Sequence, residues 1–380
     1  MSAALSLGVR HGVADVPAAE WDALVGDDQP FTSHAFLSAL EQSGSLQREL
    51  GWSAMPLLLH RGGQLIAAAP GYLKSNSHGE FVFDWAWADA YARSGLRYYP
   101  KLLIGVPYSP ISGPRLLVGS GPDAPVRRAL LVAAIERLVE ELRLSGAHVN
   151  FPIEADAAAL AHDPWLPRFD WQYHLTRGDW RDFDDYLDAL TQKKRKNIRA
   201  ERRQAAGCGL AIDWNDGAEL READLDELHA LYVENFDRKG NTPALSREFF
   251  SLLRERLPHQ MHAATARRGQ QIVAAAIFLS SSTTLYGRYW GARADLPGMH
   301  FELCYYQGIE YLLRRGLERF EPGAQGEHKI ARGFLPTRTR SAHLIAQPDF
   351  RRAIRGAIDR ETVALREYRR ELDQHSPFKP

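Results

Sequence analysis

Apolar residues along the chain recur either at helical spacing or in short runs bounded by turn residues. Leu130 and Leu138 belong to a helical series that predicts an amphipathic helix over about residues 124–144. Short apolar runs predict strands, and the glycine pair at 62–63 predicts a hairpin turn between two of them. Charged but periodic residues predict a long final helix over about 349–372.

The same order of elements is predicted twice. The first series has a strand (5–10), two helices (18–25, 33–42), three strands (54–60, 64–74, 80–84), a helix (124–144) and strands at 147–151 and 171–175. The second has a strand (210–214), two helices (222–236, 246–256), three strands (261–267, 270–280, 284–290), a helix (300–315) and strands at 317–321 and 341–346. We therefore predict an α/β protein with mixed sheets and two similar domains, residues 1–175 and 176–380.

Composition narrows the class of protein. The chain has 380 residues, of which 45% are hydrophobic and 25% charged, as expected of a globular protein. Lys and Arg balance Asp and Glu at 47 each, with 13 against 18 in residues 1–175 and so 34 against 29 in the rest. This mild imbalance argues against non-specific binding of nucleic acid over a large surface, but it allows one local basic site.

Targeting and metal signals are weak. Apolar runs are too short to span a bilayer, and the first residues lack a signal-peptide pattern, so we expect a cytoplasmic protein without a membrane span. Two cysteines, Cys208 and Cys304, are too few for a disulfide framework or a cysteine-rich zinc site. We expect no metal and no tightly bound cofactor. The oligomeric state is not predicted.

Several segments resemble the FemAB-like group of transferases, whose members carry two GNAT-type acyltransferase domains. They are "GVPYSPISGPRLL" (105–117), "LTQKKRKNIRAERRQA" (190–205), "NFDRKGNTPALSREFF" (235–250), "LYGRYWGA" (285–292) and "HFELCYYQGIEYLLRRGLERFEPGAQGEHKIARGFLP" (300–336). The resemblance covers nearly the whole chain and implies a peptidoglycan-biosynthesis or N-acetyltransferase type of activity. Within these segments the candidates for binding donor or substrate are Tyr108, Arg195, Arg199, Lys239, Arg288, Tyr289, Trp290, Gln325, Lys329 and Arg332.

The basic segment 190–205 has two interpretations, a phosphate-binding helix and a solvated helix. Arg195, Arg199 and Arg202 fall on one face of a helix and could hold the phosphates of coenzyme A or of a tRNA acceptor stem. The alternative is a solvated helix. Just after it, "QAAGCG" (204–209) matches the GNAT pyrophosphate pattern, but its glycines follow a helix and precede a strand. Gly207 is therefore better read as a helix C-cap.

In the GNAT fold the pyrophosphate loop belongs at "GARADLPGM" (291–299), which lacks the usual pattern. FemAB-like enzymes also lack that pattern because their donor is an aminoacyl-tRNA. The resemblance thus leaves two donors open, an acyl-CoA and an aminoacyl-tRNA. The acceptor would be an amine, such as that of a cell-wall precursor.

The chemistry is predicted to lie in "FEPGAQGEHKIARGFLP" (320–336). Amide formation needs a base for the amine and a donor for the oxyanion of the tetrahedral intermediate. Glu327 or His328 could be the base, and Lys329 and Arg332 could hold the oxyanion or a phosphate. Alternatively, these charges only pair with one another at the end of the sheet.

Other candidates are weaker. Cys304 follows His300 by one helical turn, but a free cysteine is more often a small buried apolar group. The aromatic segment 83–101 is more often core than a stacking platform. The leading interpretation is an N-acyltransferase. The alternative from another class is a catalytically degenerate GNAT-fold module that binds a cell-wall precursor or nucleic acid.

Overall fold

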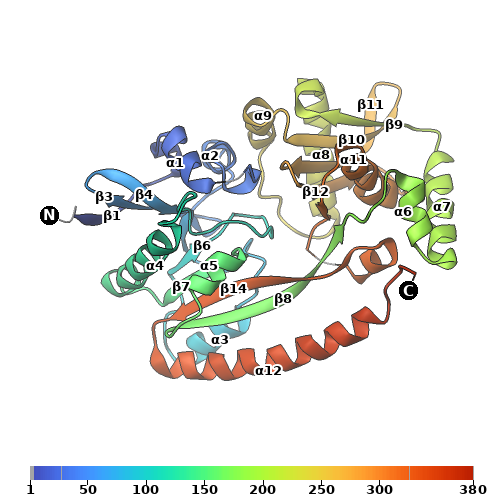
Figure 1. The fold of residues 1–380 in the computed structure, drawn as a ribbon. Helices are drawn as coiled ribbons and strands as arrows, with labels where there is room; N and C mark the ends of the chain where they lie inside the picture. The colour runs from blue at the N-terminus through green and yellow to red at the C-terminus, as the bar shows by residue number, and fades with distance from the viewer. Residues whose placement is uncertain (1–3, 27, 325, 380) are drawn as a thin grey trace. The chain divides into compact units, whose positions relative to one another are not determined.

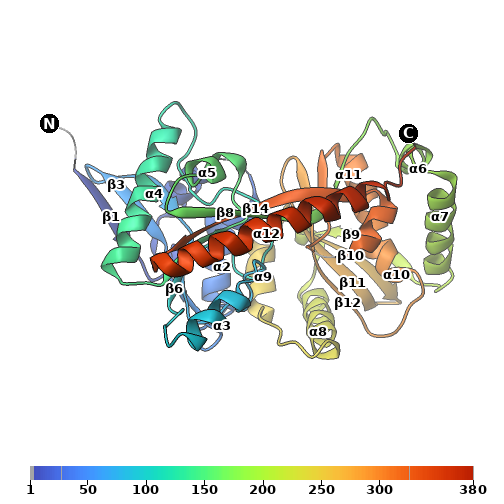
Figure 2. The same cartoon turned by 90° about the horizontal axis from the view of Figure 1, so that it is seen from below.

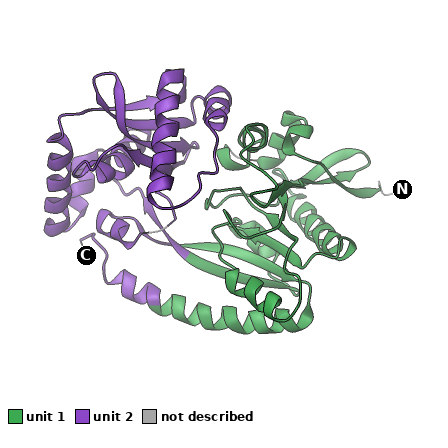
Figure 3. Ribbon diagram, turned by 180° about the vertical axis from the view of Figure 1, so that it is seen from behind, with its two compact units in different colours: residues 1–170, 338–367 green, residues 171–337, 368–380 purple. Residues whose placement is uncertain are grey.

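The computed structural model describes residues 4–26, 28–324 and 326–379, and its chain forms two compact units. Unit 1 comprises residues 1–170 and 338–367, and unit 2 comprises 171–337 and 368–380 (Figure 3). These units differ from the predicted halves 1–175 and 176–380, because residues 338–367 pack with the first part of the chain. The chain passes from one unit to the other three times, in β8 (Trp165–Thr176), in β14 (Leu335–Ile345) and in α12 (Pro348–Asp373).

Unit 1 contains two sheets and the helices that cover them (Figure 1). The small sheet has the order β1-β3-β4, and the larger one runs β2-β5-β6-β7-β14-β8. The strands are β1 (Leu5–Val9), β2 (Trp52–Ala54), β3 (Leu57–Arg61), β4 (Gln64–Ala69), β5 (Gly71–Lys74), β6 (Lys101–Ile104) and β7 (Gly146–Asn150). The helices are α1 (Ala18–Val25), α2 (His34–Gln42), α3 (Trp85–Arg93), α4 (Ala124–Glu141), α5 (Glu154–Ala159) and most of α12 (Pro348–Asp373).

Unit 2 is a mixed sheet in the order β8-β13-β12-β11-β10-β9. Its remaining strands are β9 (Ala211–Asp216), β10 (Met261–Arg268), β11 (Gln271–Ser280), β12 (Thr284–Ala292) and β13 (Arg319–Glu321). Its helices are α6 (Phe183–Ala189), α7 (Gln192–Ala206), α8 (Glu222–Arg238), α9 (Arg247–Arg256), α10 (Met299–Phe301) and α11 (Gln307–Arg315). A π-helical segment, η4 (Glu302–Tyr306), joins the last two, and a 3₁₀ helix, η5 (Glu327–Arg332), follows β13. Figure 2 labels α10 and α11, the two helices that η4 connects.

Most predicted elements are present with small shifts in their ends. The hairpin turn at Gly62 and Gly63 has positive φ at both residues, as a two-residue hairpin requires. Gly316 ends α11 in the left-handed conformation. The strand predicted at 80–84 is wrong: this segment is a loop that leads into α3, and its Glu80 and Asp84 are buried ion-pair partners rather than strand residues.

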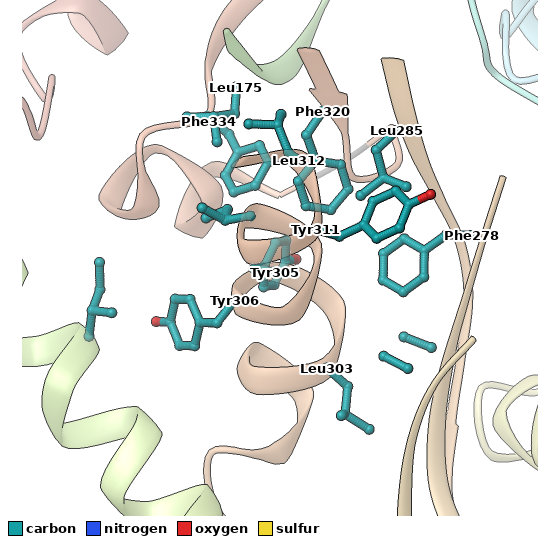
Figure 4. Packing of buried hydrophobic residues seen from close by; sticks show 14 of the residues in the cluster. Leu175, Phe278, Leu285, Leu303, Tyr305, Tyr306, Tyr311, Leu312, Phe320 and Phe334 are labelled. Atoms are coloured by element: carbon teal, nitrogen blue, oxygen red, sulfur yellow. The ribbon is translucent and has the colours of Figure 1, made fainter. Parts of the chain in front are cut away.

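The core of unit 2 is rich in aromatic residues and packs between the sheet and the η4–α11 helix (Figure 4). Phe320 of β13 lies 5.2 Å from Phe334 between ring centroids, and Phe334 lies 5.5 Å from Tyr305. Gly308 of α11 lets Phe320 approach, since a Cβ there would lie 2.5 Å from its ring. This packing fixes η4 and the segment after β13 against one face of the sheet.

Candidate active site

The candidate site lies where the parallel strands β12 and β13 stop pairing. Residues 284–286 pair with 319–321, and the last pair is Tyr286 with Glu321. β12 then continues to Ala292, while β13 ends. A β-bulge leaves Arg288 opposite no residue of β11 and bends β12 just beyond Gly287. In the GNAT fold, to which the sequence is similar, the acyl donor lies in such an opening beside the fourth strand.

Glycines allow the chain after β13 to pass close to β12. A Cβ on Gly287 would lie 3.2 Å from the Cα of Pro322, so a larger residue would push the two segments apart. Gly323 follows with φ of 103°, a conformation that other residues rarely adopt. Its carbonyl accepts a hydrogen bond of 2.7 Å from the Nζ of Lys329. The buried amine of Lys329 is thereby held beside the point where the strands part.

Lys329 is an unusual buried cation. Its side chain is only 3% exposed, and burial lowers its pKa to about 8. An ammonium has three N–H donors. Among the residues that the structure describes, the Gly323 carbonyl is the acceptor for one of them. The remaining donors could bind an anion, such as the oxyanion that develops in acyl transfer.

His328 lies with aromatic residues on the same side as η4. Its Nε2 is 2.9 Å from the hydroxyl of Tyr305, and partial burial and the charges of Lys329 and Arg332 lower its pKa. The ring is therefore neutral at pH 7. His300 lies 6.5 Å away between ring centroids, and burial lowers its pKa to about 4.

Glu327, the other predicted base, has a different setting. Its side chain is exposed, and its carboxylate accepts a hydrogen bond from the hydroxyl of Tyr368 in α12. Both residues belong to unit 2. Glu327 and His328 are the first two residues of the 3₁₀ helix η5. The geometry favours His328 over Glu327 as a proton acceptor.

Arg332 is engaged by protein groups. Its guanidinium donates to both carboxylate oxygens of Glu201 at 2.8 Å, to the Tyr306 hydroxyl at 3.0 Å and to the His328 carbonyl at 2.8 Å. It also lies 3.6 Å from the ring centroid of Phe301. With its donors used in this way, Arg332 ties η5 to α7 and to η4, and this arrangement favours a structural role over the binding of an anion.

The arginines of the basic helix α7 are also paired. Arg195 donates a hydrogen bond to Asp188, and Arg199 lies 3.8 Å from Asp184. Both aspartates belong to α6. Arg202 donates to Glu302 and Glu310 at 2.6–3.1 Å. The shared face that the sequence predicts therefore meets acidic residues of unit 2. Arg199 is nevertheless exposed, and so are Lys193, Lys196 and Arg203 of the same helix.

The remaining predicted residues fall into three groups. Trp290 and the exposed Lys239 lie near His300: the Trp290 ring centroid is 5.2 Å from it, and the Lys239 charge contributes to its lowered pKa. Tyr289 packs against Tyr232 of α8, and the Arg288 guanidinium lies over the Tyr289 ring. Tyr108 belongs to unit 1, where its hydroxyl donates to the Ser45 carbonyl, and Gln325 lies outside the described residues.

Two sequence features that we expected not to take part in the chemistry are "QAAGCG" and Cys304. Gly207 directly follows α7 and Gly209 precedes β9, so "QAAGCG" does not begin a helix and is not a GNAT pyrophosphate loop. Cys304 is partly buried in η4, and desolvation raises the pKa of its thiol, which makes it a poor nucleophile. Sequence reasoning missed Glu321, His174, Tyr305 and Glu201. The sequence holds one indication that Glu321 belongs to the site: it is an acidic residue at the end of a predicted strand, directly before Pro322 and Gly323.

Comparison with solved structures shows the fold. FemX has a TM-score of 0.54 at 10% identity, over 92% of this chain and 100% of that chain. A DUF2156 C-terminal domain from Agrobacterium fabrum has a TM-score of 0.52 at 12% identity, over 89% and 94%. The structure of L-PGS from Bacillus licheniformis gives 0.51 at 11%, over 88% and 98%. The predicted α/β fold with two tandem GNAT-like domains is thus confirmed.

No curated protein matches the chain in a sequence search. Among the described residues, no helix is long and apolar enough to cross a membrane. The profile of one protein family, described as FemAB-like and concerned with peptidoglycan biosynthesis or recognition, matches residues 12–380. This match covers nearly the whole chain, as the sequence resemblance predicts, and the protein therefore belongs to the FemAB-like family.

Proposed function

We propose that the protein is an N-acyltransferase that forms an amide by transferring an acyl or aminoacyl group to an amine. The observation that carries this proposal is the buried ammonium of Lys329 at the point where β12 and β13 part. A buried cation without a carboxylate partner costs stability, and such a cost is typical of functional sites. Family membership and the FemX-like fold support the same reaction class.

The packing of α7 favours an aminoacyl-tRNA as donor. In GNAT enzymes the coenzyme A pyrophosphate binds at the start of the helix after the fourth strand. Here Gly298 caps that position, and a Cβ on it would lie 2.5 Å from the backbone carbonyl of Glu201. The backbone of α7 thus covers the start of α10. An acyl-CoA donor would have to place its pyrophosphate elsewhere.

In the proposed reaction the carbonyl of the donor lies next to Lys329. The Nζ ammonium stabilises the oxyanion as the amine attacks, and it can then protonate the departing oxygen of the tRNA ribose. A pKa near 8 suits both tasks at neutral pH. The acceptor is an amine of a cell-wall precursor, in keeping with the description of the family.

A donor-competition experiment tests the proposal. Purified protein is mixed with a cell-wall precursor peptide that carries a free side-chain amine, and with either labelled acetyl-CoA or tRNA charged with labelled amino acids. We expect label on the peptide from charged tRNA. Label on the peptide from acetyl-CoA instead would show that the donor is an acyl-CoA and not an aminoacyl-tRNA. Tight binding of the peptide or the tRNA without transfer from either donor would favour the alternative, a binding module.

A further inference from the structure

Glu321 is a buried carboxyl group that the proposed reaction has not yet used. It is the last residue of β13 and is 3% exposed. Its Oε1 lies 3.7 Å from the Nδ1 of His174 and 3.8 Å from Arg319, too far for hydrogen bonds. Within the part of the chain that the structure describes, its Oε2 has no hydrogen-bond partner. Burying such a group is costly unless something else binds it.

The carboxyl lies on the opposite face of the sheet from Lys329 and η4. Successive residues of a strand point to opposite faces, and Phe320 packs into the core against α11 (Figure 4). Glu321 therefore shares the other face with its pairing partner Tyr286, and with His174, which lies between the two core residues Tyr173 and Leu175 of β8. On this face α8 packs farther along β12, against Gly291.

The position of the carboxyl along the strands is equally specific. Tyr286 and Glu321 form the last pair of β12 and β13, and Gly287 and Pro322 follow. Gly323, whose carbonyl binds Lys329, is two residues beyond Glu321. An acyl carbonyl in the opening between the strands would thus have the ammonium on one side and the carboxyl on the other.

We propose that Glu321 takes the proton of the attacking amine and that the acceptor enters from the face of the sheet opposite η4. This inference rests on the proposed function. The amine nitrogen attacks the carbonyl carbon, a C–N bond forms, and one N–H proton passes to the Glu321 carboxylate. The C–O bond to the tRNA ribose then breaks, and the leaving oxygen takes a proton from Lys329. The glutamic acid then returns its proton to water, and the neutral Lys329 amine takes one back from water.

The electrostatic surroundings suit this role. Burial raises the pKa of Glu321 to about 7, against the opposing effect of Arg319 on the same strand and Arg288 on β12. His174 faces it from β8, and burial lowers the pKa of that imidazole to about 3, so His174 is neutral and adds no charge. A carboxyl that is partly ionised at neutral pH is well matched to accept a proton there.

The decisive experiment compares two acceptors in Glu321→Gln. An alkylamine is protonated at neutral pH and needs a base, whereas hydroxylamine is already unprotonated. With charged tRNA as donor, we expect Glu321→Gln to lose at least about 100-fold in kcat/KM with the alkylamine and less than about tenfold with hydroxylamine. Glu318→Gln, an exposed glutamate just before β13, is the matched control and should retain both activities.

The outcomes separate this inference from the proposed function. Equal losses with both amines, or no loss, would overturn the role of Glu321 while leaving acyl transfer intact. The same would follow if His328→Ala showed the amine-dependent pattern instead. No amide from wild-type protein with either donor would overturn the proposed function, and the inference with it.

A second readout does not depend on turnover. In protein labelled with ¹³C at the glutamate carboxyls, we expect one signal that titrates near pH 7 and is missing from the spectrum of Glu321→Gln. If the signal removed by this substitution titrates in the ordinary range of glutamate instead, Glu321 is not the proton acceptor.

Discussion

At the scale of single residues, Lys329 shows that the site is maintained at a cost to stability. Its amine is buried without a carboxylate partner among the described residues, and this burial lowers its pKa from the ordinary lysine value of 10.5 to about 8. The folded state therefore binds this proton less tightly than the unfolded state does. A residue with a purely structural role would be expected to have an acidic partner, as Arg332 has in Glu201.

Replacing Lys329 with Met should therefore make the protein no less stable at pH 7. The substitution removes the buried charge, a gain of up to about 3 kcal/mol in the free energy of unfolding, offset in part by the lost bond to Gly323. The free energy of unfolding of wild-type protein should rise relative to that of the variant as pH increases from about 8 to 10.5. In this range the lysine has lost its proton in the folded state but still holds it in the unfolded state. Urea unfolding across this range measures both effects. A variant clearly less stable than wild type at pH 7 would contradict them.

At the scale of elements, one buried ion pair connects α7 to η5 and η4. Arg332 is 5% exposed and binds Glu201 through both carboxylate oxygens, while the Tyr306 hydroxyl donates to the same carboxylate. The basic helix is thus fixed to the segment that carries Lys329. This link also explains why the sequence alone assigned Arg332 to anion binding: its partner Glu201 is far away in the chain.

Glu201→Gln should destabilise the fold by roughly 2–4 kcal/mol, because it leaves the buried Arg332 without its counter-charge. Arg203→Gln, an exposed change two residues further along the same helix, should stay within about 0.5 kcal/mol of wild type. Denaturant midpoints of the two variants test this difference. Similar midpoints for both would show that the pair contributes little.

The packing of α8 on β12 depends on one glycine. A Cβ on Gly291 would lie 2.2 Å from the backbone carbonyl of Leu231 in α8, so neither segment could keep its place. We expect Gly291→Ala to lower stability by about 3 kcal/mol or more. Gly356→Ala in α12, where a Cβ would lie 3.7 Å from the guanidinium of Arg360, should be neutral or stabilising. Thermal unfolding distinguishes the two, and a neutral Gly291→Ala would refute the packing argument.

At the scale of the whole molecule, the two units repeat a parallel strand pair joined by a helix, β6-α4-β7 and β12-α11-β13. In unit 1 the first strand of this pair, β6, begins with a buried lysine whose amine has two carboxylate partners. Lys101 is fully buried and donates to Asp84, to Glu80 at 2.9 Å and to Ser77 at 3.0 Å. All three N–H donors of Lys101 are used in this way, which favours a structural role for this lysine.

Lys101→Met should accordingly destabilise the protein by about 3–5 kcal/mol, since it leaves two buried carboxyls without their cation. The effect is opposite in sign to that of Lys329→Met, although both replace a buried lysine by the same residue. Comparing the two variants by urea unfolding at pH 7 tests the distinction between a structural and a functional lysine. Equal changes in the free energy of unfolding for the two variants would contradict this distinction.

The sequence predicted the order of elements because long periodic segments such as α4, α8 and α12 carry a strong local signal. It did not predict that β14 pairs with β7, since pairing between residues so distant in the chain leaves no local pattern. For the site, the segment 320–336 was predicted from its density of glycines and charges. Which of those charges are paired depends on Glu201 and Tyr368, which only the folded chain brings near.

The most direct test of the central claim is the mass of a cell-wall precursor peptide after incubation with charged tRNA and the protein. We predict one added aminoacyl group in amide linkage with wild-type protein. Lys329→Met should lower the rate by about 100-fold or more, while Lys379→Met, a lysine outside the site, should leave it unchanged. An unmodified peptide after incubation with wild-type protein, or equal rates for Lys329→Met and wild type, would contradict the account.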